Sequence, residues 1–194
     1  MYAYLQGKFT FKNPAQVYID VNNVGYEVNI SLNTYTFIQN LPEGKLYTYL
    51  QIKEDGHTLF GFFDKEEKEI FIQLISVSGI GATIARMMLS HLKPDEVSRA
   101  IVQGNIKLLE SIKGIGKKTA ERLVLELRDK VGKISSSVTT GTVAGNSLQQ
   151  DALNALIALG ISKQQAEASI QKITLTQPNI DNLEELIKKA LKTI

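Results

Sequence analysis

The stretch Ser111-Ile-Lys-Gly-Ile-Gly-Lys-Lys-Thr-Ala-Glu-Arg122 joins two predicted helices. A short apolar helix is predicted to end at Gly114 and another to begin after Gly116, because glycine takes the positive backbone angles that a tight reversal needs. Ile115 is predicted to tuck under this turn as an apolar pin. The second helix opens with unpaired backbone N–H groups, the positive end of its dipole and two lysines. This combination predicts a phosphate-binding site.

The same pattern occurs thirty-five residues upstream, from Ser76 to Arg86. In both copies Gly-Ile-Gly follows an apolar turn, and an alanine and then an arginine line the next helix. An internal repeat is a stronger indication than a single motif. Such hairpins position a duplex without reading its sequence, because backbone N–H groups contact phosphates and not bases. The residues predicted to contact DNA are Gly79, Ile80, Gly81, Arg86, Gly114, Ile115, Gly116, Lys117, Lys118 and Arg122.

Composition and charge narrow the function classes. The 194 residues include no cysteine, which excludes disulfides, thiol nucleophiles and cysteine-based metal sites. The formal net charge is +2, but the segment from Arg86 to Lys133 has eleven basic and six acidic residues, a balance typical of nucleic-acid binding. No stretch approaches the ~18 apolar residues of a membrane span, and the N-terminus lacks a signal peptide's layout. We expect a cytoplasmic protein with no metal and no cofactor.

Residues 1–64 are predicted to form an all-β domain. Five short alternating runs in about sixty residues favour a small barrel of the oligonucleotide-binding (OB) type. Gly7 interrupts the first run, as a bulge or a close backbone approach would. Asn22-Asn23 is predicted to be a turn. Glu54-Asp55-Gly56 is predicted to separate the last two strands, because Asp-Gly between alternating apolar runs is a strong hairpin signal.

The rest of the chain is predicted to be helical. Residues 65–133 have the order helix, hairpin, helix, connector, helix, hairpin, helix, with Gly104 as a C-cap and Asn105 as an N-cap in the connector. Residues 134–146 lack charge and periodicity and are predicted to be a flexible linker. Residues 147–194 are predicted to form a small three-helix domain. The predicted fold class is therefore a multidomain α and β protein.

The sequence contains no recognisable catalytic constellation. The only histidines, His57 and His91, are predicted to be solvated. The stretch at Gly114 departs from a nucleotide-binding loop, which needs four residues between its glycines and Gly-Lys-Ser/Thr at its end. Two alternatives to a DNA-binding subunit stay open. One is a helix–hairpin–helix repair glycosylase or nuclease with a catalytic Lys or Asp, and the other is an adaptor whose hairpins only pack helices.

Glu54 and Asp55 stand out because they place two acids at a predicted hairpin tip. As turn residues they need no further explanation. On a protein otherwise suited to phosphates, however, an acidic tip repels the DNA backbone. Their functional meaning depends on the remainder of the chain.

Taken together, these residues resemble the RuvA family, the Holliday-junction-binding subunits of bacterial branch-migration complexes. The resemblance runs along the whole chain and includes Gly25-Tyr-Glu-Val28, the acids before Leu59-Phe-Gly-Phe62, both Gly-Ile-Gly hairpins and Ala155-Leu-Ile-Ala-Leu-Gly160. It implies an N-terminal OB-type barrel, a central tandem helix–hairpin–helix domain and a C-terminal three-helix domain of UBA-like type.

The resemblance also implies a non-enzymatic role in DNA recombination, repair and the SOS response. A homotetramer, single or with a second one stacked on it, would hold a four-way junction open and flat. Glu54 and Asp55 match the acidic pin of the family, which helps to part strands at the crossover. The implied partners are the hexameric RuvB ATPase and the RuvC resolvase. Leu156, Leu159 and Ile161 match the apolar surface that docks on RuvB, although they are equally consistent with the core of a three-helix domain.

The chain departs from the family pattern in two places. Many relatives have Gly-Pro-Lys in the first hairpin, whereas here Gly81 is followed by Ala82-Thr83. The first hairpin therefore lacks one expected phosphate-facing lysine, and its grip is predicted to rest on backbone N–H groups and Arg86. In the C-terminal domain, Ile161 stands where an aromatic residue occurs in relatives.

Overall fold

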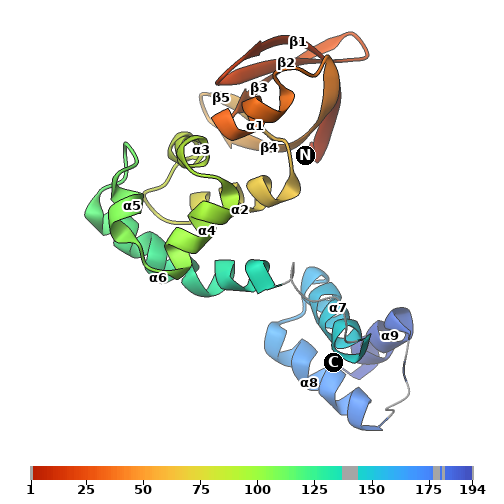
Figure 1. Ribbon diagram of the computed structural model, residues 1–194. Coiled ribbons are helices and arrows are strands. Elements are labelled where there is room, and N and C mark those ends of the chain that lie inside the picture. The colour runs from red at the N-terminus through yellow and green to blue at the C-terminus, as the bar shows by residue number, and fades with distance from the viewer. Residues whose placement is uncertain (1, 137–143, 177–179, 181, 194) are drawn as a thin grey trace. The chain divides into compact units, whose positions relative to one another are not determined.

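The computed structural model describes residues 2–136, 144–176, 180 and 182–193. The chain forms two compact units, residues 1–139 and residues 140–194. The first unit contains a β-barrel followed by a group of helices, and the second contains three helices (Figure 1). The multidomain α and β fold class is therefore confirmed.

Five strands close the barrel in the order β1-β2-β3-β5-β4. All neighbouring strands are antiparallel except β3 and β5, which run parallel. Residues at alternate positions point inward and fill the interior, as expected for a small barrel. The elements are β1 (Tyr4–Asn13), β2 (Gln16–Val21), β3 (Val24–Ile30), α1 (Leu32–Ile38), β4 (Glu43–Lys53) and β5 (Gly56–Phe62).

Local chemistry explains most of the barrel's irregular points. A Cβ on Gly7 would lie 2.0 Å from the carbonyl oxygen of Asp20, so Gly7 marks a close backbone approach, while the bulge falls at Thr10. Asn22 and Asn23 have φ angles of 52° and 67°, as a two-residue turn of type I′ requires. The all-β prediction for this segment is wrong at α1. This helix is initiated by Ser31, whose side chain accepts a hydrogen bond from the Thr34 N–H.

The hairpin between β4 and β5 differs from its prediction. Lys53 pairs with Gly56, so the two loop residues are Glu54 and Asp55, and Gly56 is the first residue of β5. Of the predicted loop Glu54-Asp55-Gly56, the two acids form the turn and Gly56 is already paired in β5. Both acids are consequently at the tip of the hairpin, and both are exposed.

Five helices follow the barrel in the same compact unit. Asp64 caps the first of them by accepting a hydrogen bond from Glu67 N–H at 2.7 Å, and Pro94 begins α4. Gly104 has φ +67°, and the Asn105 side chain caps α5, as predicted. The helices are α2 (Lys65–Ile75), α3 (Ala82–His91), α4 (Pro94–Val102), α5 (Ile106–Glu110) and α6 (Lys117–Ser136).

The interior of the barrel forms one apolar core, and the helices form a second one that includes Phe60 and Phe62 of β5. Phe60 and Phe62 of β5 are buried together with α2, and the ring of Phe71 lies 5.2 Å and 4.8 Å from theirs. The four helices that follow, α3 to α6, contribute further buried residues, among them Leu109 of α5. These include Met88, Leu89, Ile101, Leu123 and Leu127.

The second unit consists of α7 (Ala144–Ala158), α8 (Lys163–Thr176) and α9 (Leu183–Thr193). Because α6 continues to Ser136 and α7 begins at Ala144, both helices extend into the segment 134–146 that was predicted to be a linker. Residues 137–143 of that segment lie outside the described residues. None of the helices in the described parts of the chain is long and apolar enough to cross a membrane.

Candidate nucleic-acid interface

The two Gly-Ile-Gly hairpins have the same backbone geometry. Gly79 and Gly114 both have φ +94°, in the region that favours glycine. At the preceding helix ends, the Ser76 hydroxyl donates to Gln73 O and the Ser111 hydroxyl donates to Leu108 O, each at 2.7 Å. The repeat seen in the sequence is therefore a structural repeat.

The isoleucine in each hairpin faces inward. Ile80 and Ile115 are buried, with 4% and 5% of their surfaces exposed. Their N–H groups donate to the carbonyls of Val77 and Ile112, each at 3.1 Å. Ile115 is the apolar pin that the sequence predicts. Because both the side chains and the N–H groups of Ile80 and Ile115 are engaged within the protein, their prediction as DNA contacts is not supported.

The two hairpins pack against each other reciprocally. A Cβ on Gly79 would lie 3.9 Å from Thr119 Oγ1, and a Cβ on Gly114 would lie 3.6 Å from Ile84 Cγ1. Ile84 and Thr119 occupy the same place in the two repeats, thirty-five residues apart. The first hairpin thus meets the start of α6, and the second meets the start of α3. This approximate twofold arrangement gives one paired surface.

Each hairpin leads into a helix whose first N–H groups are uncapped by the preceding side chain. Gly81 precedes α3 and Gly116 precedes α6, and glycine has no side chain with which to cap. The Gly81 and Gly116 carbonyls accept from Ala85 and Ala120, each at 3.0 Å, so the helical ladders begin here. Two helix N-termini with free donors, on one paired surface, suit two phosphates of a nucleic-acid backbone.

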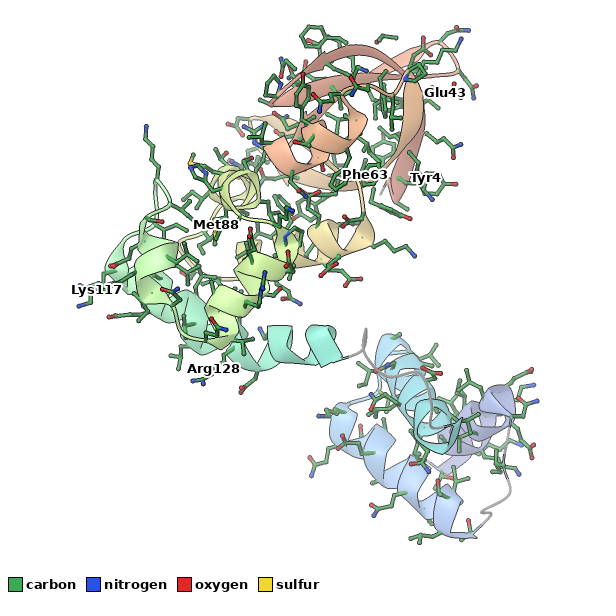
Figure 2. All side chains as sticks on the ribbon, in the orientation of Figure 1. Tyr4, Glu43, Phe63, Met88, Lys117 and Arg128 are labelled. Atoms are coloured by element: carbon green, nitrogen blue, oxygen red, sulfur yellow. The ribbon has the colours of Figure 1, made fainter. Side chains whose placement is uncertain are left out.

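The two hairpins differ in the charge of the residues around them. Around the second hairpin, Lys113, Lys117 and Lys118 are all exposed. Figure 2 shows Lys117 extending away from the ribbon at this end of the helical group. The equivalent residues around the first hairpin are Ser78, Ala82 and Thr83, none of which is charged. Lys113 was not among the predicted DNA contacts, although its exposure next to the positive-φ Gly114 suits that role.

Arg122 lies one turn further along α6. Its guanidinium forms an ion pair with Glu126 at 3.2 Å, and both side chains are at least partly exposed. A surface pair of this kind is weak and exchanges readily with other partners. Arg122 therefore remains a candidate phosphate contact at the edge of the paired surface.

Arg86 faces the barrel. Its Nη1 donates to the carbonyl of Ala15 at 3.1 Å and to Asn29 Oδ1 at 2.8 Å. The side chain is half-buried, and burial lowers the pKa of the guanidinium from its ordinary value. The geometry therefore does not support its predicted phosphate contact. In the repeat of thirty-five residues Arg86 is equivalent to Glu121, so it has no arginine counterpart in the second hairpin.

The acidic turn formed by Glu54 and Asp55 is the other charged feature of the first unit. It joins the end of β4 to the start of β5. The other end of β5, at Phe62, leads into α2, which begins at Lys65. The barrel thus presents negative charge at a hairpin tip, whereas the helices present positive charge at the second hairpin. The two kinds of charge lie on different elements of one compact unit.

The predicted partner-binding residues of the second unit have different environments. Leu156 is completely buried and packs in the core of the three helices, so its prediction as an exposed docking residue is wrong and its interpretation as a core residue is correct. Leu159 is 62% exposed. Ile161 is half-buried against the same core, and its N–H donates to Leu156 O at 3.1 Å. Only Leu159 of these three residues offers a large apolar surface.

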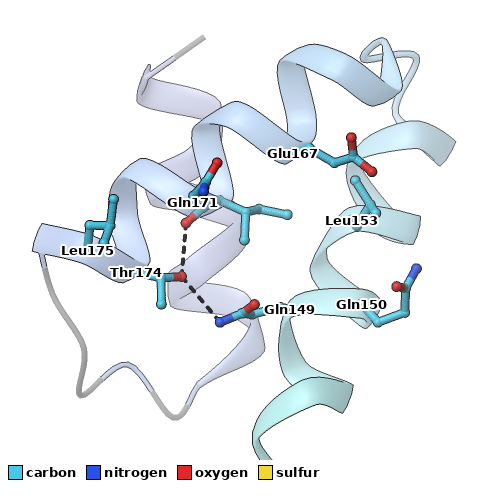
Figure 3. Close-up of a pocket in the computed structure, with 8 residues that line it drawn as sticks. Gln149, Gln150, Leu153, Glu167, Gln171, Thr174 and Leu175 are labelled. Atoms are coloured by element: carbon cyan, nitrogen blue, oxygen red, sulfur yellow. Dashed lines mark hydrogen bonds between the residues drawn. The ribbon is translucent and has the colours of Figure 1, made fainter.

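A groove of about 690 Å³ lies between α7 and α8 (Figure 3). Gln149 Nε2 donates to Thr174 Oγ1 at 3.5 Å along this groove. Its one ionisable lining residue, Glu167, is paired with Lys163 at 3.5 Å. No group of three or more His, Asp or Glu side chains suited to a metal ion occurs among the described residues.

Three family models match the chain in sequence order. Residues 1–61 match the RuvA N-terminal domain, and residues 71–129 match a SAM-like tandem helix-hairpin-helix. Residues 147–194 match the RuvA C-terminal domain. A protein of Flavobacterium psychrophilum named "Holliday junction branch migration complex subunit RuvA" is 47% identical over 194 residues, which cover the whole of both chains.

This chain belongs to the RuvA family. Other relatives with the same name are similar along their whole length. The protein of Cytophaga hutchinsonii is 45% identical over 197 residues, which cover 99% of each chain, and that of Christiangramia forsetii is 44% identical over the whole of both chains. Both hairpins lie within the helix-hairpin-helix match, and the acidic turn lies within the RuvA N-terminal match.

Proposed function

We propose that this chain is a structure-specific DNA-binding subunit that binds Holliday junctions without sequence preference. The paired hairpin surface carries this proposal, because it offers two sets of backbone donors with one geometry and lysines beside one of them. Phosphate contacts of this kind carry no base information. Gly79, Gly81, Gly114 and Gly116 supply the backbone, and the exposed lysines of the second hairpin, together with Arg122, supply the charge.

Glu54 and Asp55 are proposed to act at the crossover of the junction. Two exposed carboxylates on a narrow hairpin repel phosphates and so favour separated strands around them. The subunit is further proposed to assemble as a homotetramer, in which four acidic turns meet at one crossover. The tetramer holds the junction open and flat, and a second tetramer is able to cover its other face.

The force for branch migration is proposed to come from a separate RuvB-type hexameric ATPase. The subunit itself then catalyses no reaction, and its part in recombination and repair is to hold the DNA and recruit the motor. Residues 147–194 are the proposed motor-binding part, with Leu159 as its exposed apolar contact. RuvC-type resolvase is a further proposed partner on the same junction.

An electrophoretic mobility assay tests the central proposal. We expect tight binding to a synthetic four-way junction and much weaker binding to linear duplex of the same sequence and total length. Equal affinity for the two DNAs contradicts structure-specific binding. Measuring the mass of the complex with and without the junction gives the number of subunits, and any number other than four or eight contradicts the proposed assembly.

The acidic turn has its own test. The double variant Glu54→Gln/Asp55→Asn is expected to bind the junction as well as or better than the unmodified protein, because two repulsive charges are removed. Branch migration with the ATPase present is expected to change. Loss of binding together with disturbed folding contradicts a role at the crossover and leaves Glu54 and Asp55 as turn residues only.

A further inference from the structure

Glu67 is a buried acid to which the proposed mode of DNA binding assigns no role. It lies in the first turn of α2, immediately after the barrel, and its surface is fully buried. An ionised carboxylate is costly to bury unless hydrogen bonds satisfy it. Its surroundings therefore have to supply donors, and they come from the barrel side of the unit.

Two hydroxyl groups satisfy the carboxylate. Ser31 Oγ donates a short hydrogen bond to Oε1, and Thr34 Oγ1 donates to Oε2 at 2.6 Å. Each hydroxyl in turn accepts a hydrogen bond from a backbone N–H. The Thr34 N–H donates to Ser31 Oγ, and the Phe63 N–H donates to Thr34 Oγ1, each at 3.0 Å. Both hydroxyls are therefore relays that accept from the main chain and donate to Glu67.

The direction of these relays selects a carboxylate. A carboxylate offers two acceptor oxygens and no donor, which suits two incoming hydroxyl protons. A glutamine of the same shape offers one acceptor and one donor, so one hydroxyl proton loses its acceptor. A partly satisfied buried network is worse than a complete one. Glu67 thus acts as the common end point of two hydrogen-bond chains.

These hydrogen bonds connect α2 to the barrel at the point where the barrel ends and α2 begins. Ser31 and Thr34 belong to the first turn of α1, and Phe63 is the residue that follows β5. A second set of contacts fastens α3, the helix on the other side of the first hairpin. Arg86 donates to Ala15 and Asn29 of the barrel, and Leu32 N–H donates to Ser90 Oγ at 3.0 Å.

We infer that Glu67 is a positioning residue for junction binding, which fixes the angle between the barrel and the helices on either side of the first hairpin. The inference rests on the proposed function, because that angle sets where the acidic turn lies relative to the paired hairpin surface. Binding elements act together only when rigid supports hold them in place. Glu67 touches no DNA in this scheme and acts through Ser31 and Thr34.

The first experiment measures the angle directly, without DNA. The chain contains no cysteine, so Gln6→Cys and Gln103→Cys place two spin labels on exposed sites of the barrel and of the helical group. Labelled chains are diluted into unlabelled ones so that distances within one subunit dominate. We expect one narrow distance in the parent and a broadened or shifted one in Glu67→Gln. An unchanged narrow distance in Glu67→Gln overturns the inference.

Glu66→Gln is the matched control. Glu66 is exposed, lies in the same first turn of α2 and loses the same charge. Any change in charge near the helix N-terminus affects both variants equally. We expect the label distance in Glu66→Gln to match the parent, and the same broadening in both variants also overturns the inference.

The second experiment compares DNA affinities. In Glu67→Gln we expect the preference for a four-way junction over linear duplex to fall about tenfold, the effect of losing one hydrogen bond to a charged group. Duplex affinity changes less than about twofold, because the phosphate contacts themselves stay intact. A lower melting temperature with an unchanged preference indicates only a structural role and overturns the inference. If the parent shows no junction preference, the proposed function fails, whereas the label distances still decide the role of Glu67.

Thr34 provides a second route if Glu67→Gln folds poorly. Thr34→Val keeps the shape of the side chain and removes one relay, whereas Thr34→Ser keeps the hydroxyl. We expect Thr34→Val to broaden the label distance and lower the junction preference, and Thr34→Ser to behave as the parent. Identical behaviour of the two variants shows that the relay does not set the angle.

Discussion

The first hairpin, residues 76–81, and the second, residues 111–116, share a backbone but differ in their surroundings. The first is flanked by α2 and α3, which are hydrogen-bonded to the barrel through Glu67 and Arg86. The second is flanked by exposed lysines. The repeated motif therefore has one backbone geometry, with the barrel contacts beside one copy and the exposed lysines that we propose to contact DNA beside the other. The following predictions test this division.

Removing the charge of the second hairpin is expected to have the largest effect. Lys117→Ala/Lys118→Ala should weaken binding to junction and duplex alike by roughly 10- to 100-fold at low salt, because two phosphate contacts per subunit are lost. The slope of log affinity against log salt should fall by about two per subunit. Binding titrations at several salt concentrations measure both quantities.

Lys107→Ala/Lys130→Ala is a control with the same loss of charge at exposed helical positions away from the Gly-Ile-Gly turns. It should leave the salt slope closer to that of the parent. An equal fall in slope for both double variants shows that the lysines of the second hairpin act only through net charge.

The shared backbone is tested by Gly79→Ala and Gly114→Ala. Both glycines have φ +94° and no atom closer than 3.6 Å to an added Cβ, so backbone strain is the main cost. We expect each substitution to lower the free energy of unfolding by about 1–3 kcal/mol, measured by chemical denaturation. Gly25→Ala, at a glycine without positive φ and with open space, is the control. A large difference between the two hairpin variants contradicts their structural equivalence.

Adding charge to the first hairpin should make it resemble the second. Thr83 is exposed at the position equivalent to Lys118, so Thr83→Lys places one ammonium beside the uncapped start of α3. We expect the salt slope to steepen by about 0.9 per subunit and affinity to rise a few-fold. Thr83→Gln, similar in length but uncharged, should match the parent. No change in slope for Thr83→Lys indicates that the first hairpin does not approach phosphate.

The smallest expected effect is a dependence of the protein's folding stability on pH that arises from the Glu67 carboxyl. Burial raises the pKa of this carboxyl, its hydrogen bonds with Ser31 and Thr34 lower it in part, and the nearby charge of Asp64 raises it further. The two hydroxyls orient the ionised carboxylate but offset only part of the cost of burying its charge, so the folded-state pKa lies above the unfolded value. The stabilisation that comes from this pKa difference is fully present below the unfolded pKa. This stabilisation is lost as pH rises through the folded-state pKa.

Denaturation of parent and Glu67→Gln across this pH range measures the effect. The stability of the parent relative to the variant should increase as pH falls from neutral towards 4.5, the ordinary value for glutamate. A difference that stays constant with pH shows that the carboxyl does not change protonation within that range. Burial and nearby acids also raise the pKa of Glu66, so Glu66→Gln gives the pH dependence of an exposed neighbour, which the effect at Glu67 has to exceed.

The sequence was sufficient for the elements whose signals are local. Glycines, caps and apolar periodicity located both hairpins and the helices around them, because a positive φ or an uncapped helix end depends on a few adjacent residues. The seven-residue helix α1 was missed, since its apolar residues are too few to distinguish a helix from a strand. Gly56 was predicted to lie in the loop after Glu54-Asp55 but is paired with Lys53, because strand pairing, rather than the Asp-Gly signal, sets the register of this turn.

Individual site residues were harder to assign, because their roles depend on distant partners. Arg86 was grouped with the DNA contacts, but its partners are Ala15 and Asn29, 71 and 57 residues away in the chain. Leu156 and Leu159 are close in sequence, yet only packing against α8 and α9 decides that Leu156 is buried and Leu159 exposed. Glu67 gave no signal at all, because acids in the first turn of a helix are common for reasons of dipole and capping.

The contact of Phe71 with Phe60 and Phe62 has a consequence for how the chain emerges during synthesis. All five strands of the barrel precede α2, so the barrel segment is made before its last strand can be covered. Until α2 arrives, the outer rings of β5 lack the neighbours that bury them. A nascent chain stopped after Phe62 therefore exposes these aromatic rings and is prone to aggregate. Productive folding waits for one more helix, and a shortened gene encoding only the strands should give an aggregating product.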